Sequence, residues 1–122
     1  MNGKILIADD EPNIVVALEY LLQRSGYEVH VARDGDEALS QVNALLPDLV
    51  LLDVMMPRRN GYEVCKAIKA RAELQRTKVV MLSAKGRDAE VNLGMAAGAD
   101  LYITKPFSTR ELLAKIKTLL PS

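Results

Sequence analysis

Several residue types are scarce in this sequence, and each scarcity removes a class of protein. The chain has one cysteine, which excludes an internal disulfide and indicates a reducing compartment. No apolar run approaches the ~20 residues that a helix needs to span a bilayer. The N-terminus reaches acidic residues too soon for a secretory signal. We therefore expect a cytoplasmic protein that does not enter a membrane.

An excess of charge of either sign is also absent. Lysine plus arginine number 16, as do aspartate plus glutamate, which leaves no electrostatic footprint for nucleic acid or an anionic membrane. The length of 122 residues suits one domain with a proper core, and 49% hydrophobic residues are ordinary for a globular protein. We expect a single domain over residues 1–122, with no DNA-binding segment.

The most informative stretch is VLLDVMMP, residues 50–57. Its first three residues do not alternate with polar ones, which is typical of a strand covered on both faces in a parallel sheet. An unpaired charge inside such a strand would be costly, so Asp53 is expected at the carboxyl end of the strand. In open α/β sheets that edge is where ligands bind.

The rest of the chain alternates strands with helices. Strands are predicted over residues 4–8, 28–32, 50–53, 78–82 and 101–104. Helices are predicted from Pro12, after an Asp34 cap, after Gly61, over residues 87–97, and after a Thr109 cap. This alternation predicts an α/β fold, a doubly wound five-stranded parallel sheet in the order 2-1-3-4-5 with five helices on both faces.

That topology brings polar residues from separate segments to one edge of the sheet. Asp9 and Asp10 follow the first strand, beside Asp53 at the end of the third. Crowded carboxylates repel one another unless some protonate or a cation lies among them. The ligand set is all oxygen, and the single histidine, His30, lies on a predicted outer strand, so Mg²⁺ is favoured over zinc.

The fourth and fifth strands end at Ser83 and Lys105, which add a hydroxyl donor and a second positive charge. This set suits a phosphoryl group, with Asp53 as the nucleophile. Each residue alone has a plainer interpretation: Asp10 or Glu11 as a helix cap, Asp53 as a turn residue, Ser83 as a cap, Lys105 as a solvated charge. Their joint occurrence at successive strand ends favours the functional interpretation.

At these residues the whole chain resembles the response-regulator receiver domain of bacterial two-component signalling. The matching motifs are ADDE at 8–11, LLDVMMP at 51–57, NG at 60–61, LSAKG at 82–86, GAD at 98–100 and YITKPF at 102–107. The resemblance implies a phosphorylation-activated switch. It implies no enzyme in the ordinary sense, since such a domain catalyses only its own Mg²⁺-dependent phosphorylation and dephosphorylation.

The resemblance also implies roles for individual residues. Asp53 would accept a phosphoryl group from a histidine kinase or phosphotransfer protein. Asp9, Asp10 and Asp53 would hold Mg²⁺ together with the backbone carbonyl of Met55.

Lys105 would pair with the phosphoryl group, and its peptide bond to Pro106 would be cis. Ser83 would reach a phosphoryl oxygen, and Tyr102 would turn inward when Ser83 moves. The surface formed by the fourth helix, fifth strand and fifth helix would then contact an output domain or partner.

Two departures from the family pattern stand out. Arg59 lies where the family usually has Met or Leu, so the loop lacks its apolar anchor. Some regulators form homodimers on phosphorylation through charge pairs, and this chain matches that pattern only in part: Asp100, Glu111 and Lys115 fit it, whereas Val91 and Leu101 replace charges.

Three other classes of protein share part of this pattern. A flavodoxin-like electron carrier needs a Ser/Thr- and Gly-rich loop after the first strand, where this chain has acidic residues 9–11. A dehalogenase-type phosphatase places its nucleophilic Asp after the first strand, whereas here the central Asp follows the third. A degenerate receiver that only binds is disfavoured by the intact set of Asp10, Asp53, Ser83 and Lys105. We expect the chain to be either a stand-alone regulator or part of a longer one.

Overall fold

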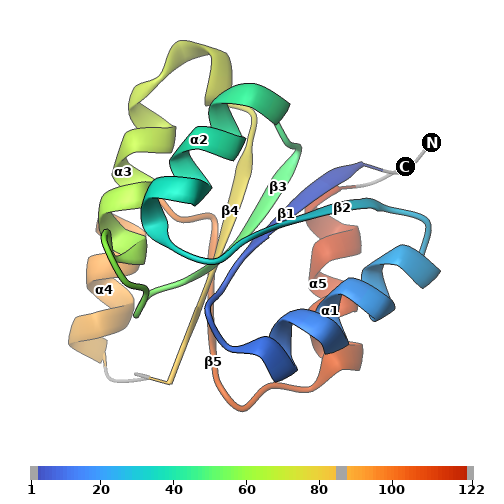
Figure 1. The fold of residues 1–122 in the computed structure, drawn as a ribbon. Helices are drawn as coiled ribbons and strands as arrows, with labels where there is room; N and C mark the ends of the chain where they lie inside the picture. The colour runs from blue at the N-terminus through green and yellow to red at the C-terminus, as the bar shows by residue number, and fades with distance from the viewer. Residues whose placement is uncertain (1–2, 85–87, 121–122) are drawn as a thin grey trace.

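The computed structural model, which describes residues 3–84 and 88–120, is built on one parallel five-stranded sheet (Figure 1). The strands lie in the order β2-β1-β3-β4-β5, as the sequence predicts. Their bounds are β1 Lys4–Ala8, β2 Glu28–Ala32, β3 Leu49–Asp53, β4 Lys78–Ser83 and β5 Leu101–Thr104. The predicted fold class is confirmed.

Helices cover both faces of the sheet. In Figure 1, α1 and α5 lie together on one side, and α2, α3 and α4 lie on the other. Their bounds are α1 Pro12–Arg24, α2 Gly35–Leu45, α3 Gly61–Ala70, α4 Asp88–Ala96 and α5 Thr109–Leu119, with a short 3₁₀ turn η1 at Ala72–Leu74. The two layers enclose two hydrophobic clusters, one on each face.

The central strand β3 explains the unbroken apolar run in the sequence. All five of its residues are buried. Leu49 and Leu51 enter the cluster beneath α1 and α5, and Val50 and Leu52 enter the cluster beneath α2 and α3. Because successive side chains of a strand point to opposite faces, a strand covered on both faces needs apolar residues at consecutive positions.

The register of the central strands determines where the acidic residues meet. Ala8 of β1 pairs with Leu52 of β3. Asp9 and Asp53 are each the next residue, so they emerge side by side at the carboxyl edge of the sheet. The chain leaves β1 for α1 on one face and β3 for α3 on the other, so this edge is a topological switch point.

Helix starts follow the predicted capping chemistry in most places. The Asp34 side chain accepts a hydrogen bond from the Glu37 N–H and caps α2. Ser108, not Thr109, caps α5: its hydroxyl accepts from the Glu111 N–H at 3.3 Å, so the predicted cap is wrong by one residue. The extended backbone of Ser108 orients the hydroxyl toward the first turn, while Thr109 is already helical. The predicted start of the fourth helix, at residue 87, lies outside the described residues.

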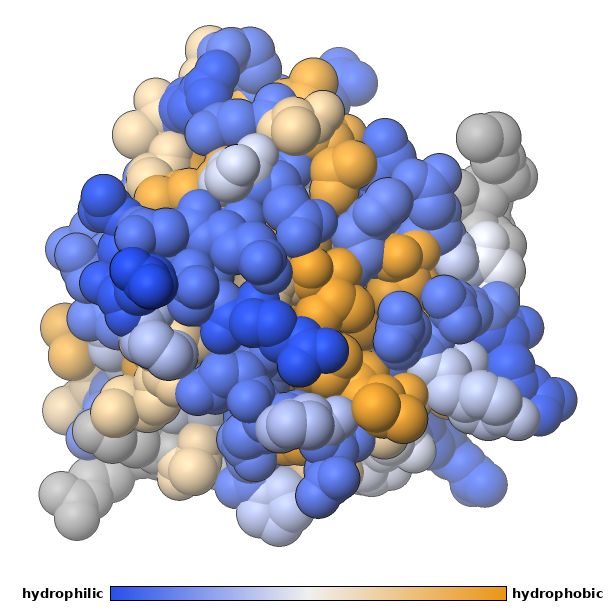
Figure 2. Space-filling model, in the orientation of Figure 1, coloured by the Kyte–Doolittle hydropathy of each residue, from blue (hydrophilic) through white to orange (hydrophobic). Residues whose placement is uncertain are grey.

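Figure 2 shows an apolar strip in the middle of one face, between mainly hydrophilic surfaces. In this view the edge strand β2 passes in front of the other strands. β2 is an edge strand, and its Val29 and Val31 are half-buried.

Among the described residues, no helix is long and apolar enough to cross a membrane.

An ionic network joins α3 to the amino-terminal ends of β4 and β5. The Asp100 carboxylate accepts hydrogen bonds from the Val79 N–H at 2.8 Å and from Lys69 Nζ at 2.9 Å. Lys69 Nζ also donates to the Thr77 carbonyl at 2.8 Å. The network lies at the opposite end of the sheet from Asp53, so it belongs to the scaffold.

Replacing Asp100 by Ala is expected to destabilise the fold by about 2 kcal/mol, because it removes the partner of a half-buried ammonium and of a backbone N–H. Urea unfolding of wild type and variant measures the difference. Glu73→Ala, which removes an exposed ion pair with Arg71, serves as the control and is expected to change the midpoint little. Equal midpoints for Asp100→Ala and wild type would contradict a structural role for this network.

Candidate functional site

Three carboxylates gather at the carboxyl edge of the sheet. Within the described ranges, Asp9, Asp10 and Asp53 each offer an oxygen that lies within 4.8 Å of the others. Asp9 is fully buried and Asp53 is 4% exposed, while Asp10 is exposed. Burial makes the negative charges expensive unless cations offset them.

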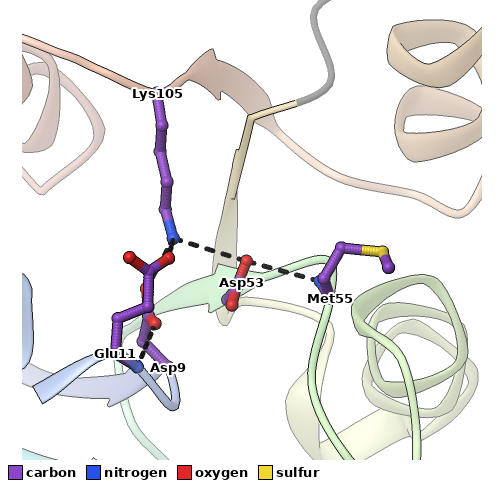
Figure 3. A network of polar contacts seen from close by, with 5 residues as sticks. All are labelled: Asp9, Glu11, Asp53, Met55 and Lys105. Atoms are coloured by element: carbon purple, nitrogen blue, oxygen red, sulfur yellow. Dashed lines mark hydrogen bonds and ion pairs between the residues drawn. The ribbon is translucent and has the colours of Figure 1, made fainter.

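Lys105 provides one such cation (Figure 3). Its Nζ donates to Asp9 at 3.1 Å and to Glu11 at 2.7 Å, and lies 3.5 Å from the Asp53 carboxylate. Lys105 follows the edge strand β5, which is separated from β3 by β4. Its side chain therefore extends past the end of β4 to reach the ends of β1 and β3. It therefore lies between the acids that follow β1 and the acid that ends β3.

The turn from β1 into α1 shapes this site locally. Asp9 accepts a hydrogen bond from the Glu11 N–H at 2.9 Å, and Pro12 occupies the first turn of the helix, where a missing N–H costs nothing. Glu11 is at the cap position but makes no side-chain cap hydrogen bond, and it binds Lys105 instead. Capping was the role predicted for Glu11 from its position; its place as the third consecutive acid is the sequence signal for its part in this site.

The Asp53 carboxyl is harder to ionise than an ordinary aspartate. Burial and the neighbouring Asp9 raise its pKa to about 6, although Lys105 and the Met55 N–H, which donates at 3.3 Å, act in the opposite direction. The Asp10 charge adds to the increase. The ionised form of Asp53 is therefore disfavoured, first by burial and then by its acidic neighbours.

Lys105 stays protonated despite its burial. Burial alone lowers the pKa of its ammonium, but the hydrogen bond to Glu11 and the charges of Asp53 and Asp9 outweigh that effect and raise the pKa above its usual value. A fixed ammonium with its side chain only 10% exposed is suited to neutralise an anionic group beside Asp53.

The donor set fits a hard divalent cation. The three carboxylates lie around the ammonium of Lys105, and burial together with the Asp9 charge raises the pKa of Asp53, so a further cation would stabilise its ionised form. All the offered ligand atoms are oxygens, which Mg²⁺ prefers. Asp9, Asp10 and Asp53 are the side chains in the described chain that could hold such an ion.

Ser83 and Tyr102 occupy different places relative to this cluster. Ser83 ends β4, is fully buried, and follows Leu82, which pairs with Asp53 in the sheet. Tyr102 pairs with Met81, further from the edge, and its ring lies against helix α4, where a Cβ on Gly94 would come within 2.7 Å of it. The structure thus puts Ser83 at the acidic edge and Tyr102 behind it.

Other expected features can be located as well. The Lys105–Pro106 bond is cis. The loop at Arg59 lacks the apolar anchor of the family and has an ionic contact instead, because the Arg59 guanidinium pairs with Asp36 at 2.7 Å. Of the LSAKG motif, residues 85 and 86 lie outside the described residues.

Comparison with known proteins agrees with this geometry. The family described as "Response regulator receiver domain" matches residues 5–117. The alkaline phosphatase synthesis transcriptional regulatory protein PhoP of Bacillus subtilis is 48% identical over 120 residues, which cover 98% of this chain and 49% of that protein.

Solved structures agree in fold. The chemotaxis response regulator CheY4 of Vibrio cholerae matches with a TM-score of 0.92 at 32% identity, covering 98% of this chain and 100% of that one. A BeF3-activated DrrB receiver domain matches with a TM-score of 0.89 at 37% identity, covering 98% of this chain and 97% of that one.

The chain belongs to the receiver domain family of two-component response regulators. It spans about half the length of the curated relative PhoP.

Proposed function

We propose that this domain is a signalling switch operated by Mg²⁺-dependent phosphorylation of Asp53. The observation that carries the proposal is the convergence of Asp9, Asp10 and Lys105 on Asp53, a buried carboxylate at a topological switch point. Flavin binding does not suit this edge, because its acidic residues would repel a flavin phosphate.

The acceptor step follows from the chemistry of the Asp53 side chain. A carboxylate oxygen forms a bond to phosphorus while the bond from phosphorus to the donor nitrogen of a phosphohistidine breaks. The histidine leaves as imidazole after taking up a proton, and Asp53 becomes a mixed anhydride. A bound Mg²⁺ would neutralise phosphoryl oxygens and lower the electrostatic barrier to the approach of two anions.

Lys105 and Ser83 act on the phosphoryl group from the neighbouring strands. The Lys105 ammonium already lies 3.5 Å from Asp53, and a short movement would bring it to a phosphoryl oxygen. The buried Ser83 hydroxyl, at the end of β4, can donate a hydrogen bond to another oxygen. Such charge-assisted bonds exist only in the phosphorylated state.

Those bonds supply the energy for the switch. Moving a two-state equilibrium from nearly all inactive to nearly all active takes about 5.5 kcal/mol of differential interaction. Two or three charge-assisted hydrogen bonds reach that scale. Ser83 would transmit the change to Tyr102 and to the surface of α4, β5 and α5, where an output domain or partner would bind.

Incubation with acetyl phosphate and Mg²⁺ tests the proposal. The wild-type chain is expected to gain one phosphoryl group by intact mass, to lose it with hydroxylamine as acyl phosphates do, and to gain none with EDTA. Uptake that is indifferent to EDTA would contradict the metal requirement, and an absence of uptake would contradict the proposed function.

The donor protein is proposed to dock beside Lys105. A cavity of about 260 Å³ lies between α1 and the loop that joins β5 to α5. Apolar side chains dominate its lining, which includes Ile14, Ala17 and Phe107 next to Lys105 itself. A histidine kinase or phosphotransfer protein that places its phosphohistidine on Asp53 must cover this region, and an apolar side chain of the donor fits the cavity.

Ala17→Glu is expected to slow phosphotransfer from a phosphorylated histidine kinase by at least about tenfold, because it places a charge in the apolar docking cavity. The rate with acetyl phosphate is expected to stay unchanged. Rapid-quench phosphotransfer with the kinase that best phosphorylates wild type measures the effect. Equal slowing with both donors would show that the cavity does not serve protein docking.

A cytoplasmic location and a longer regulator that binds DNA are consistent with this function, since the curated relative is a transcriptional regulatory protein of which the chain covers half. Nucleic-acid binding would belong to another part of such a regulator.

A homodimer through α4, β5 and α5 would use Glu111 and Lys115, which are exposed, more readily than Asp100, which is bound to Lys69 within its own chain.

A further inference from the structure

The loop between β3 and α3, residues 54–60, is closed at its base and held at its tip. At the base, the Gly61 N–H donates to the Val54 carbonyl at 2.8 Å, and a Cβ on Gly61 would lie 2.5 Å from the Asp53 carbonyl oxygen. The loop therefore starts directly at the candidate acceptor and returns to it. Met55, whose carbonyl is a proposed metal ligand, is its second residue.

The tip of the loop rests on the amino-terminal end of helix α2. The Gly35 N–H donates to the Pro57 carbonyl at 3.2 Å. Arg59 pairs with Asp36 at 2.7 Å, and Arg58 lies 3.5 Å from Asp34. We refer to these contacts between residues 34–36 and residues 57–59 as the α2 tether.

The backbone within the tip is strained. Arg58 has a φ of 72°, a left-handed conformation that a non-glycine residue rarely adopts. The Arg59 N–H donates to the Pro57 carbonyl at 2.8 Å and closes a three-residue turn around Arg58. A turn of this kind is unfavourable by itself and persists only where the surroundings impose it.

The approach of the two segments is also unusually close. A Cβ on Gly35 would lie 2.3 Å from the Arg59 carbonyl oxygen, so any larger residue would push the loop away from α2. Glycine is a poor residue for a helix start on propensity alone. Its presence is explained by the space that the loop needs.

We propose that Asp36 and Arg59 are positioning residues for the divalent-cation site, an inference that rests on the proposed function. The α2 tether holds the strained turn, and the turn fixes the direction in which the Met55 carbonyl points. Met55 is next but one to Asp53, and its N–H donates to the Asp53 carboxylate at 3.3 Å, so the backbone at Met55 is in contact with the site. Outer contacts of this kind orient the groups that bind a metal and tune its affinity.

A titration with Mg²⁺ in the absence of any phosphodonor tests the proposal. Binding is measured by calorimetry or by the NMR chemical shifts of the loop amides. Asp36→Asn and Arg59→Gln are each expected to weaken Mg²⁺ binding by up to about tenfold, the lower end of the cost of losing an outer partner of a metal site. The maximal rate of phosphorylation at saturating Mg²⁺ is expected to stay within about twofold of wild type, because the acceptor and Lys105 are untouched.

The charge-swapped double variant Asp36→Arg/Arg59→Asp restores the pair with reversed polarity, and we expect it to recover most of the Mg²⁺ affinity. Gly35→Ala provides an independent route, because it improves helix propensity while displacing the loop, and it is expected to weaken Mg²⁺ binding without reducing helical content. Arg71→Gln, which removes an exposed ion pair with Glu73 at the other end of α3, is the matched control.

Wild-type Mg²⁺ affinity in Asp36→Asn, Arg59→Gln and Gly35→Ala would overturn the positioning role while leaving the proposed function intact. Weaker binding in the single variants without recovery in the charge swap would overturn the role of the Asp36–Arg59 pair. A wild-type chain that binds no Mg²⁺ would overturn the inference together with the metal requirement of the proposed function.

Discussion

Replacement of Lys105 by Met is expected to slow phosphorylation by acetyl phosphate about a hundredfold, the usual cost of removing one preorganised charge from a site where negative charge develops. The same change is expected to tighten Mg²⁺ binding. The ammonium now offsets the charges of Asp9, Glu11 and Asp53, so its removal makes that cluster more attractive to another cation. Titration and labelling on one sample give both values.

The opposite signs of these two effects distinguish a catalytic role from a structural one. If Lys105→Met merely loosened the fold, Mg²⁺ affinity and labelling would fall together. Lys69→Met is the matched control, because Lys69 is a half-buried lysine with an ion pair at the other end of the sheet. We expect Lys69→Met to lose stability but to keep its labelling rate. Unchanged labelling in Lys105→Met would refute the assigned role of its ammonium.

Metal-free Asp53→Asn is expected to be more stable than the metal-free wild type at about pH 7.5, by on the order of 1–3 kcal/mol. Burial and Asp9 raise the pKa of Asp53 from 3.8 to about 6, so the folded state disfavours the ionised carboxyl. Asn has nearly the same shape and no charge. The substitution therefore removes an unfavourable interaction.

The pH dependence follows from the sign of that pKa shift. Between 3.8 and about 6 the folded wild type binds more protons than the unfolded chain, so its stability falls as the pH rises through this window and then levels off. Asp53→Asn lacks this fall, so the two proteins converge in acid.

Urea unfolding in EDTA across this pH range measures the difference, with Glu19→Gln on α1 as the control. Saturating Mg²⁺ is expected to stabilise the wild type and narrow the gap, because ligand binding stabilises the folded state alone. A less stable Asp53→Asn at neutral pH would contradict the electrostatic picture of the site.

The fold was predictable because local and global signals agree. The apolar runs of β3 and β4, the glycines that end helices, and the Asp34 cap all indicate the same alternation of strands and helices. Once the strand order is inferred, the meeting of Asp9 with Asp53 follows from topology, since residues after paired strands emerge together. Chain topology, rather than side-chain detail, made this part of the site readable.

Contacts that depend on side-chain reach were not predictable. Glu11 binds Lys105 instead of capping α1, because the buried ammonium offers a stronger partner than solvent-exposed N–H groups. The partner of Arg59 lies 23 residues earlier, and no local pattern links it to Asp36. Ser108 rather than Thr109 caps α5 because the backbone is still extended at Ser108 and becomes helical at Thr109, a boundary that the sequence does not fix to one residue.

The most direct measurement is the site of the phosphoryl group after treatment with acetyl phosphate and Mg²⁺. Wild type and Asp53→Asn are labelled in parallel, digested, and mapped by mass spectrometry after reduction of the acyl phosphate with borohydride. We predict that the label in wild type falls on Asp53 alone and that Asp53→Asn takes up none. Label of equal amount in Asp53→Asn, or label on Asp9 or Asp10 in the wild type, would contradict the account.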